Sequence, residues 1–167
     1  MRLDLDRDRP VLARRIAEGV AAFASAAPPP LDLPVTRIDI EYDLTTMDEP
    51  CVWAYLDTHP GGEPASGSSA RWKLLEQWCP HWAAACHAAC VGQPVTVRAA
   101  GREVRVEDED DLNRAAGQFF VGLLKELRDF ATFTELPRAG DCYLGVSTTG
   151  GGFGWPAWED RGPDNMV

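Results

Sequence analysis

The clearest hydrophobic pattern along the chain is a strict alternation within residues 35–44. From Ile38 to Leu44 every second side chain is apolar, and the side chains between them are acidic. A period of two is typical of a β-strand that buries one face and leaves the other in water. Residues 45–50 favour a turn and residues 51–57 a second strand. We therefore expect an antiparallel hairpin whose first strand turns its carboxylates to solvent.

Three longer segments have apolar side chains at the three- and four-residue spacing that predicts amphipathic helices. The first, residues 8–26, has Pro10 in its opening turn and ends before three consecutive prolines. The second, residues 70–91, contains Pro80, so we expect a kink there or two abutting helices. The third, residues 109–131, opens with an acidic run that complements the dipole of a helix N-terminus.

Shorter strands complete the predicted order α-β-β-α-β-β-α-β-β. Residues 95–106 favour a hairpin in which Gly101 takes the positive φ of the turn. Residues 142–146 and 153–155 are predicted to pair across the glycine-rich turn 148–152, and residues 58–69 to form a polar loop. This order favours an α+β fold, a mostly antiparallel sheet built from hairpins with about three helices packed on one face.

The length and composition fit one α+β domain spanning residues 1–167, with an irregular C-terminal tail at 156–167. The net charge of −10 argues against binding nucleic acid through its phosphates and suits a basic protein partner. No apolar run reaches the length of about 18 residues that crosses a membrane. Charges occupy the start, where a signal peptide would be apolar, so we expect no membrane association and a cytoplasmic location. The sequence does not indicate an oligomeric state.

The cysteines are the most suggestive candidates for a metal site. Cys79, Cys86 and Cys90 would share one face of the predicted second helix, and three thiolates could hold zinc with a fourth ligand. The same face carries apolar residues, and free cysteine is among the most buried residue types. We interpret the three as core positions and all five cysteines as free thiols, so we predict no metal and no cofactor.

Two further motifs fail on inspection. Asp4, Asp6 and Asp8 match the opening of a calcium-binding loop, but Arg9 stands where that loop needs glycine. The glycines of residues 150–154 lack the Lys-Ser/Thr pair and the following helix of a phosphate-binding loop.

Histidine chemistry gives an alternative function, a small hydrolase or ligand-binding enzyme that uses a His/carboxylate pair. His59 stands two residues after Asp57, and His81 could meet a carboxylate from elsewhere in the chain. No serine or cysteine lies in a nucleophile-elbow context, so we assign no catalytic residue and favour a protein that is not an enzyme.

Acidic side chains interleaved with aromatic ones instead suit docking to a basic protein, because aromatics anchor a contact and carboxylates steer association. The alternative is that the aromatics are core and the acids only keep the protein soluble. The candidate partner-binding residues are Asp39, Glu41, Asp43, Asp48, Glu49, Trp53 and Tyr55.

Three segments carry a resemblance to a known group of proteins. They are the acidic strand 37–44, the aromatic strand Val52-Trp53-Ala54-Tyr55-Leu56 and the closing Gly151-Gly152-Phe153-Gly154-Trp155-Pro156. In these three segments the chain resembles the small acidic immunity proteins of bacterial polymorphic-toxin systems and the domains grouped with them. The resemblance implies an α+β inhibitor that binds a cognate toxin without chemistry of its own. It carries over no site residues.

Overall fold

The computed structural model describes residues 1–27, 34–45, 49–58, 71–148 and 154–159. Within these residues the chain forms three helices and eight strands. In chain order they are β1 (Arg2–Asp4), α1 (Arg9–Ala24), β2 (Val35–Asp43), β3 (Cys51–Asp57), β4 (Arg71–Trp78), α2 (Ala83–Cys90), β5 (Val95–Ala99), β6 (Arg102–Val106), α3 (Glu109–Asp129), β7 (Arg138–Thr148) and β8 (Gly154–Glu159).

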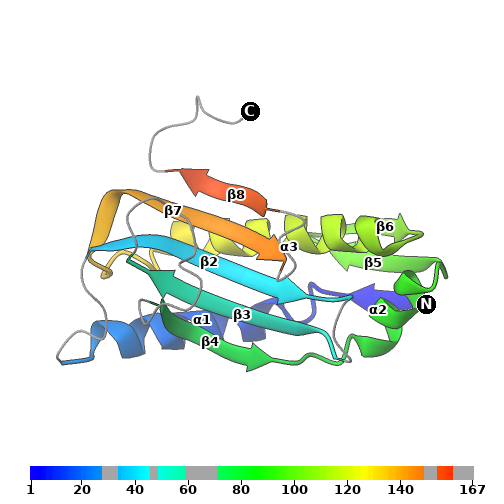
Figure 1. Cartoon of the computed structure of the whole chain (residues 1–167), viewed down its shortest axis with the longest axis horizontal. Coiled ribbons are helices and arrows are strands. Elements are labelled where there is room, and N and C mark those ends of the chain that lie inside the picture. The colour runs from blue at the N-terminus through cyan, green and yellow to red at the C-terminus, as the bar shows by residue number, and fades with distance from the viewer. Residues whose placement is uncertain (28–33, 46–48, 59–70, 149–153, 160–167) are drawn as a thin grey trace.

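The described strands form two sheets (Figure 1). The large sheet has the order β4-β3-β2-β7-β8, and the small sheet has the order β1-β5-β6. Four of the neighbouring pairs are antiparallel, whereas β2–β7 and β1–β5 are parallel. The predicted α+β class with mostly antiparallel pairing is confirmed. The parallel pairs were not predicted, because each joins strands far apart in the sequence.

Helices α1 and α3 cover one face of the large sheet and lie behind it in Figure 1. Helix α1 packs against β4, and α3 packs against β7 and β8. Helix α3 also contacts β5 and β6, so it bridges the two sheets. The buried apolar side chains of both sheets belong to one hydrophobic cluster. No helix of the described residues is apolar over a stretch that could cross a membrane.

The alternating strand β2 supplies the centre of this core, as predicted. Its apolar side chains, Ile38, Ile40 and Tyr42, are almost completely buried against the helices. The Tyr42 hydroxyl donates a hydrogen bond of 2.8 Å to the carbonyl oxygen of Asn113. Its ring stacks on Phe120 with the centroids 4.9 Å apart. Burial raises the pKa of Tyr42, so this hydroxyl keeps its proton and its role as a donor.

The prediction of a second helix over residues 70–91 is wrong for the first half of that segment. The chain forms β4 there, and only α2 is helical. Two register shifts between β3 and β4 leave Trp72, Leu75 and Trp78 on the face toward the helices. Their spacing of three imitates the apolar stripe of a helix, because each bulge adds a residue to the normal alternation. Pro80 lies between β4 and α2 rather than within a helix.

The two ends of the chain also differ from the prediction. The short strand β1 was missed, although Leu3 and Leu5 alternate with charged residues and are buried. The tail is not irregular from Pro156, since β8 runs through Glu159 and pairs with β7. Strand β8 is an edge strand, where a proline is tolerated. The loop 58–69 and the turn 148–152 lie largely outside the described residues.

The remaining elements follow their sequence signals. Helix α3 begins as expected, because the Asp108 carboxylate accepts a hydrogen bond of 2.9 Å from the backbone N–H of Asp111. The hairpin of β5 and β6 is confirmed, and both Ala100 and Gly101 have positive φ in its turn. Such a turn matches the twist of the two strands.

Candidate functional site

The face of the large sheet opposite α1 and α3 carries most of the predicted site residues, and we call it the outer face. Residues paired directly across neighbouring strands point to the same side of a sheet. The registers therefore place one set of polar, aromatic and charged side chains there. Its described members are Arg37, Asp39, Glu41, Asp43, Cys51, Trp53, Tyr55, Asp57, Arg71, Lys73, Tyr143 and Ser147.

Two of the predicted docking carboxylates are buried, which corrects the expectation that they face solvent. Asp39 is 2% exposed and Asp43 is 6% exposed, and the neighbouring Asp57 is 2% exposed. A buried carboxylate must be paired or hydrogen-bonded, because its desolvation is costly. Arginines on the same face meet this need for Asp39 and Asp57, and the Asp43 carboxylate accepts a hydrogen bond of 3.1 Å from the backbone N–H of Thr45.

Arg37 and Asp39 form the first ion pair of the outer face. The Nε of Arg37 donates a hydrogen bond to Oδ2 of Asp39, and the guanidinium lies 5.0 Å from the centroid of the Tyr143 ring. The other oxygen, Oδ1 of Asp39, is buried without a hydrogen-bond partner among the described residues. Burial raises the pKa of Asp39 even though the Arg37 guanidinium acts to lower it.

Arg71 ties three strands together on the same face. Its Nη1 donates a hydrogen bond of 2.9 Å to Oε1 of Glu41 on β2, and its Nε lies 3.5 Å from Oδ2 of Asp57 on β3. The guanidinium also lies 4.9 Å from the centroid of the Tyr55 ring. Burial, with the nearby Glu41 carboxylate, raises the pKa of Tyr55. The arrangement fixes Glu41 and Tyr55 in one geometry.

The other predicted residues are spread around this network. Trp53 is half-buried on the outer face, directly opposite Glu41 in the ladder. Glu49 is exposed just before β3, and Asp48 lies outside the described residues. Sequence reasoning placed Arg37 on the same strand face as the carboxylates, but it missed the ion pair of Arg37 with Asp39 and the contribution of Arg71. Arg71 was assigned to a helix, so nothing in the sequence indicated that it would reach β2.

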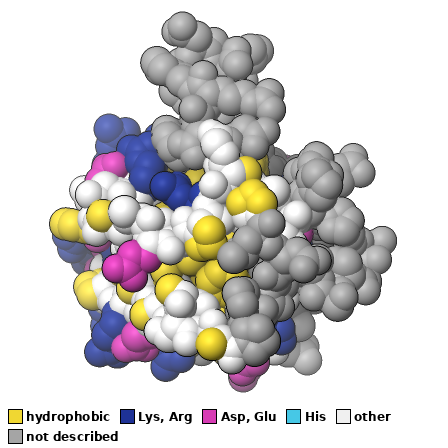
Figure 2. Space-filling model, turned by 90° about the vertical axis from the view of Figure 1, so that its left-hand side faces the viewer, with side chains coloured by type: hydrophobic (Ala, Val, Ile, Leu, Met, Phe, Trp, Pro, Cys, Tyr) yellow, Lys and Arg dark blue, Asp and Glu magenta, His cyan; other side chains and the backbone are white. Residues whose placement is uncertain are grey.

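The negative charge is also dispersed elsewhere on the molecule. Figure 2 shows the end of the molecule at which α1 and α3 finish. Its Asp and Glu side chains are separated from one another and mixed with Lys and Arg side chains. On this end the net charge is therefore not gathered into one acidic patch.

The cysteines do not share one face as predicted. Cys79 follows β4 and lies opposite Cys51 at the start of β3, with the two Sγ atoms 2.9 Å apart. Cys86 is buried in α2, and Cys90 is exposed at its end. All five cysteines are free thiols. Among the described residues, no group of three or more His, Cys, Asp or Glu side chains is arranged to hold a metal ion.

One histidine does lie near a carboxylate. The Nε2 of His81 is 3.9 Å from Oδ2 of the buried Asp8, and that oxygen accepts a hydrogen bond of 2.8 Å from Nε1 of Trp82. His81 and Trp82 line a cleft of about 620 Å³ beside the N-terminus. His59 lies outside the described residues. The cleft is a second candidate site and shares no residue with the outer face.

Comparisons of this chain with protein-family models, curated proteins and solved structures gave no match.

Proposed function

We propose that the protein is a non-enzymatic interaction domain that binds a basic protein partner through the outer face, as an immunity-like inhibitor would. The observation that carries the proposal is the grouping of Glu41, Trp53 and Tyr55 on adjacent strands, all half-buried and all still accessible. Aromatic side chains held in one geometry make strong anchors, because little conformational entropy is lost when a partner binds.

The burial of two predicted contact residues changes their proposed role. Asp39 and Asp43 are buried and paired with Arg37 and with the backbone N–H of Thr45, so we assign partner contact to Glu41, Glu49, Trp53 and Tyr55, and leave Asp48 as a predicted contact. The net charge of −10 acts at longer range, where it would speed encounter with a basic surface.

The test uses affinity capture followed by a measured affinity. Wild-type protein would serve as bait in a lysate of the native host, and each captured protein would then be purified for titration. We expect Trp53→Ala to weaken binding of the true partner by roughly 30-fold, the effect of losing about 2 kcal/mol at an interface anchor. Glu41→Gln should slow association at low salt more than at high salt.

Glu18→Gln is the matched control for charge, because Glu18 is exposed on α1, away from the outer face. It should bind as wild type does. If the Trp53→Ala variant binds the partner as tightly as the wild-type protein does, the proposed surface is contradicted. If none of the captured proteins binds the purified domain in the titration, the interaction function itself is contradicted.

The alternative of a His/carboxylate enzyme has one supporting observation, the nearness of His81 and Asp8. Their separation of 3.9 Å is too long for a hydrogen bond. The described residues that line the cleft include no serine, threonine or cysteine that His81 could activate. The cleft therefore favours ligand binding over nucleophilic catalysis.

A further inference from the structure

The cleft beside the N-terminus is built from three separate parts of the chain. Strands β1 and β5, the turn after β1 and the residues at the start of α2 all contribute side chains to its lining. Its lining residues are Met1, Arg2, Leu3, Asp4, Arg7, His81, Trp82, Ala84, Ala85 and Arg98.

The lining has the opposite charge to the whole protein. It contains three arginines and one histidine but only one carboxylate, that of Asp4, in a chain of net charge −10. The pairing of β1 with β5 offsets part of this positive charge, because it places Asp4 directly opposite Arg98. A cationic hollow on an acidic protein focuses the local field toward an anion.

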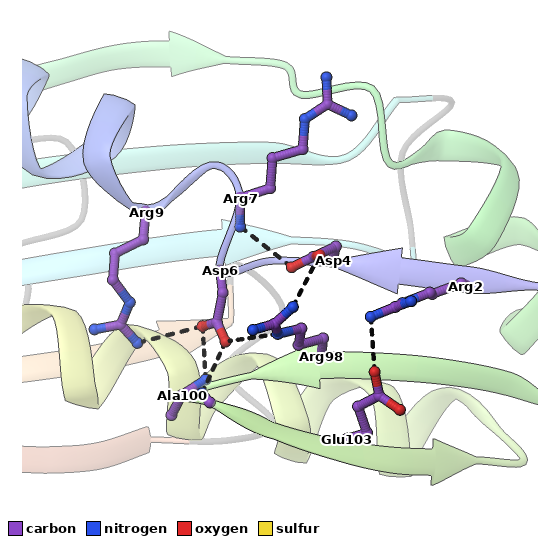
Figure 3. Close-up of polar contacts among 9 residues, drawn as sticks. Arg2, Asp4, Asp6, Arg7, Arg9, Arg98, Ala100 and Glu103 are labelled. Atoms are coloured by element: carbon purple, nitrogen blue, oxygen red, sulfur yellow. Dashed lines mark hydrogen bonds and ion pairs between the residues drawn. The ribbon is translucent and has the colours of Figure 1, made fainter.

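Two of the arginines have donors left for a ligand. The guanidinium of Arg98 lies 3.9 Å from Asp4 Oδ2 and 3.7 Å from Asp6 Oδ2, and it donates no hydrogen bond to a described residue. The Arg7 side chain is exposed and points away from these ion pairs (Figure 3), without a partner among the described residues. Arg2 is less available, since it donates to Glu103 at 2.7 Å.

Asp6 neutralises Arg98 only in part, because its carboxylate is already occupied. Its two oxygens accept hydrogen bonds of 2.8 Å and 2.7 Å from the backbone N–H groups of Ala100 and Gly101 in the β5–β6 turn (Figure 3). Arg9 lies on the other side of the same carboxylate, at 3.7 Å. The Asp6 carboxylate therefore accepts hydrogen bonds from the turn and also lies near two guanidinium groups, those of Arg9 and Arg98.

Besides the exposed His81 and Met1, the remaining lining consists of apolar side chains. Trp82 is 1% exposed, and its hydrogen bond to Asp8 fixes the indole against the wall. Leu3 and Ala85 are also buried, while Ala84 is exposed at the opening. The cleft thus places guanidinium donors beside an apolar wall, a combination that suits a ligand with an anionic end and an apolar body.

We propose that this cleft binds a small organic oxyanion, a carboxylate or phosphate ester carried on an apolar body. Arg98 holds the oxygens through charge-assisted hydrogen bonds, the exposed Arg7 side chain turns toward them when the ligand binds, and the wall beside Trp82 receives the apolar part. The site is independent of the outer face, so it goes beyond the proposed interaction function.

The test is calorimetric titration of the full-length protein with phenyl phosphate, benzoate, inorganic phosphate and neutral benzyl alcohol. At least one of the two aromatic anions should bind with a Kd below about 10 mM, and at least about tenfold more tightly than benzyl alcohol or inorganic phosphate. The preferred anion distinguishes phosphate esters from carboxylates as the natural class.

Variants then locate the binding. Arg7→Gln and Arg98→Gln should each weaken the preferred anion about tenfold, whereas Arg14→Gln, at an exposed arginine of α1 outside the cleft, should not. Because Arg7 is exposed, its variant should unfold at the wild-type temperature and remain a clean test. Equal binding of benzyl alcohol, absence of binding by both aromatic anions, or wild-type affinity in both cleft variants would overturn the proposal.

Discussion

At the scale of single residues, Gly145 is the position where the outer face has no room for a side chain. It lies opposite Asp39 in the parallel pair of β2 and β7. A Cβ at this position would lie 2.5 Å from Oδ1 of Asp39 and would also overlap the ring of Tyr143. The Arg37–Asp39 pair therefore depends on the absence of a side chain on the neighbouring strand.

We predict that Gly145→Ala lowers the free energy of unfolding by about 1–3 kcal/mol, the usual cost of overpacking. Gly140→Ala in the same strand is the control, because a Cβ there would meet no atom within 4 Å. It should leave stability unchanged or raise it slightly. Urea unfolding at neutral pH measures both, and equal stability of the two variants would contradict the packing described for Asp39.

Cys51 and Cys79 form a second residue-scale feature with a chemical consequence. Their sulfur atoms are 2.9 Å apart, Cys79 is exposed, and burial together with the neighbouring Cys79 thiol raises the pKa of Cys51 to about 11. Oxidised glutathione can attach to Cys79, after which the Cys51 thiolate displaces glutathione and forms a protein disulfide. Overall, two protein thiols are oxidised and the glutathione disulfide is reduced to two thiols.

We predict that oxidised glutathione removes two of the five free thiols. The disulfide should form faster as the pH rises, because Cys51 must lose its proton before it can displace glutathione from Cys79. Thiol titration of the denatured protein and peptide mapping of the disulfide measure the outcome. Cys51→Ser should retain glutathione on Cys79, whereas Cys90→Ser should still form the disulfide. Formation of a protein disulfide at Cys79 in Cys51→Ser would rule out this pair.

At the scale of elements, the close approach of α1 to β4 depends on Gly19. A Cβ at this helical position would overlap the backbone of Leu74, which is buried in β4. Gly122 is the corresponding glycine of α3, where the nearest atom to a Cβ would be Nη2 of Arg9, at an ordinary 3.6 Å. A side chain is therefore excluded at Gly19 but has room at Gly122.

We predict that Gly19→Ala destabilises the protein by about 1–3 kcal/mol, because α1 must move away from the sheet. Gly122→Ala should stabilise it by about 0.5–1 kcal/mol, the gain expected for alanine over glycine within a helix. The midpoints of chemical unfolding compare them directly. If both substitutions stabilise the protein, α1 does not pack on β4 as closely as described.

At the scale of the whole molecule, α3 connects the two sheets. It packs against β7 and β8 on one side and against β5 and β6 on the other, within one hydrophobic cluster. A shared core of this kind makes separate unfolding of the small sheet unfavourable, since α3 would lose its packing against β5 and β6. The sequence-based expectation of one domain over residues 1–167 remains a prediction that unfolding can test.

We predict a single cooperative transition, with coincident curves from circular dichroism and tryptophan fluorescence. Val97→Ala in the small sheet should cost about 2 kcal/mol and shift both curves together. The fluorescence curve is informative because Trp72 and Trp78 belong to the large sheet. A fluorescence midpoint that stays at the wild-type value in this variant would indicate two independent units.

Local patterns were sufficient for much of the fold. The alternation in β2, the turn at Ala100-Gly101 and the acidic start of α3 each reflect interactions within a few residues, and each element formed as predicted. The apolar face of β2 is buried for the same reason, because side chains of a strand alternate between its two faces whatever lies beside it.

Contacts between distant segments decided the rest. Asp39 and Asp43 alternate with apolar residues as solvent-facing side chains do, yet they are buried on a second face of the sheet. Arg71 reaches Glu41 because β4 and β2 both pair with β3, and the cleft joins β1 to α2 across about half the chain. The sequence alone determined which residues form each face of a regular strand such as β2. Only the tertiary structure decided what meets each face, because pairing partners and ion pairs come from residues that no local spacing connects.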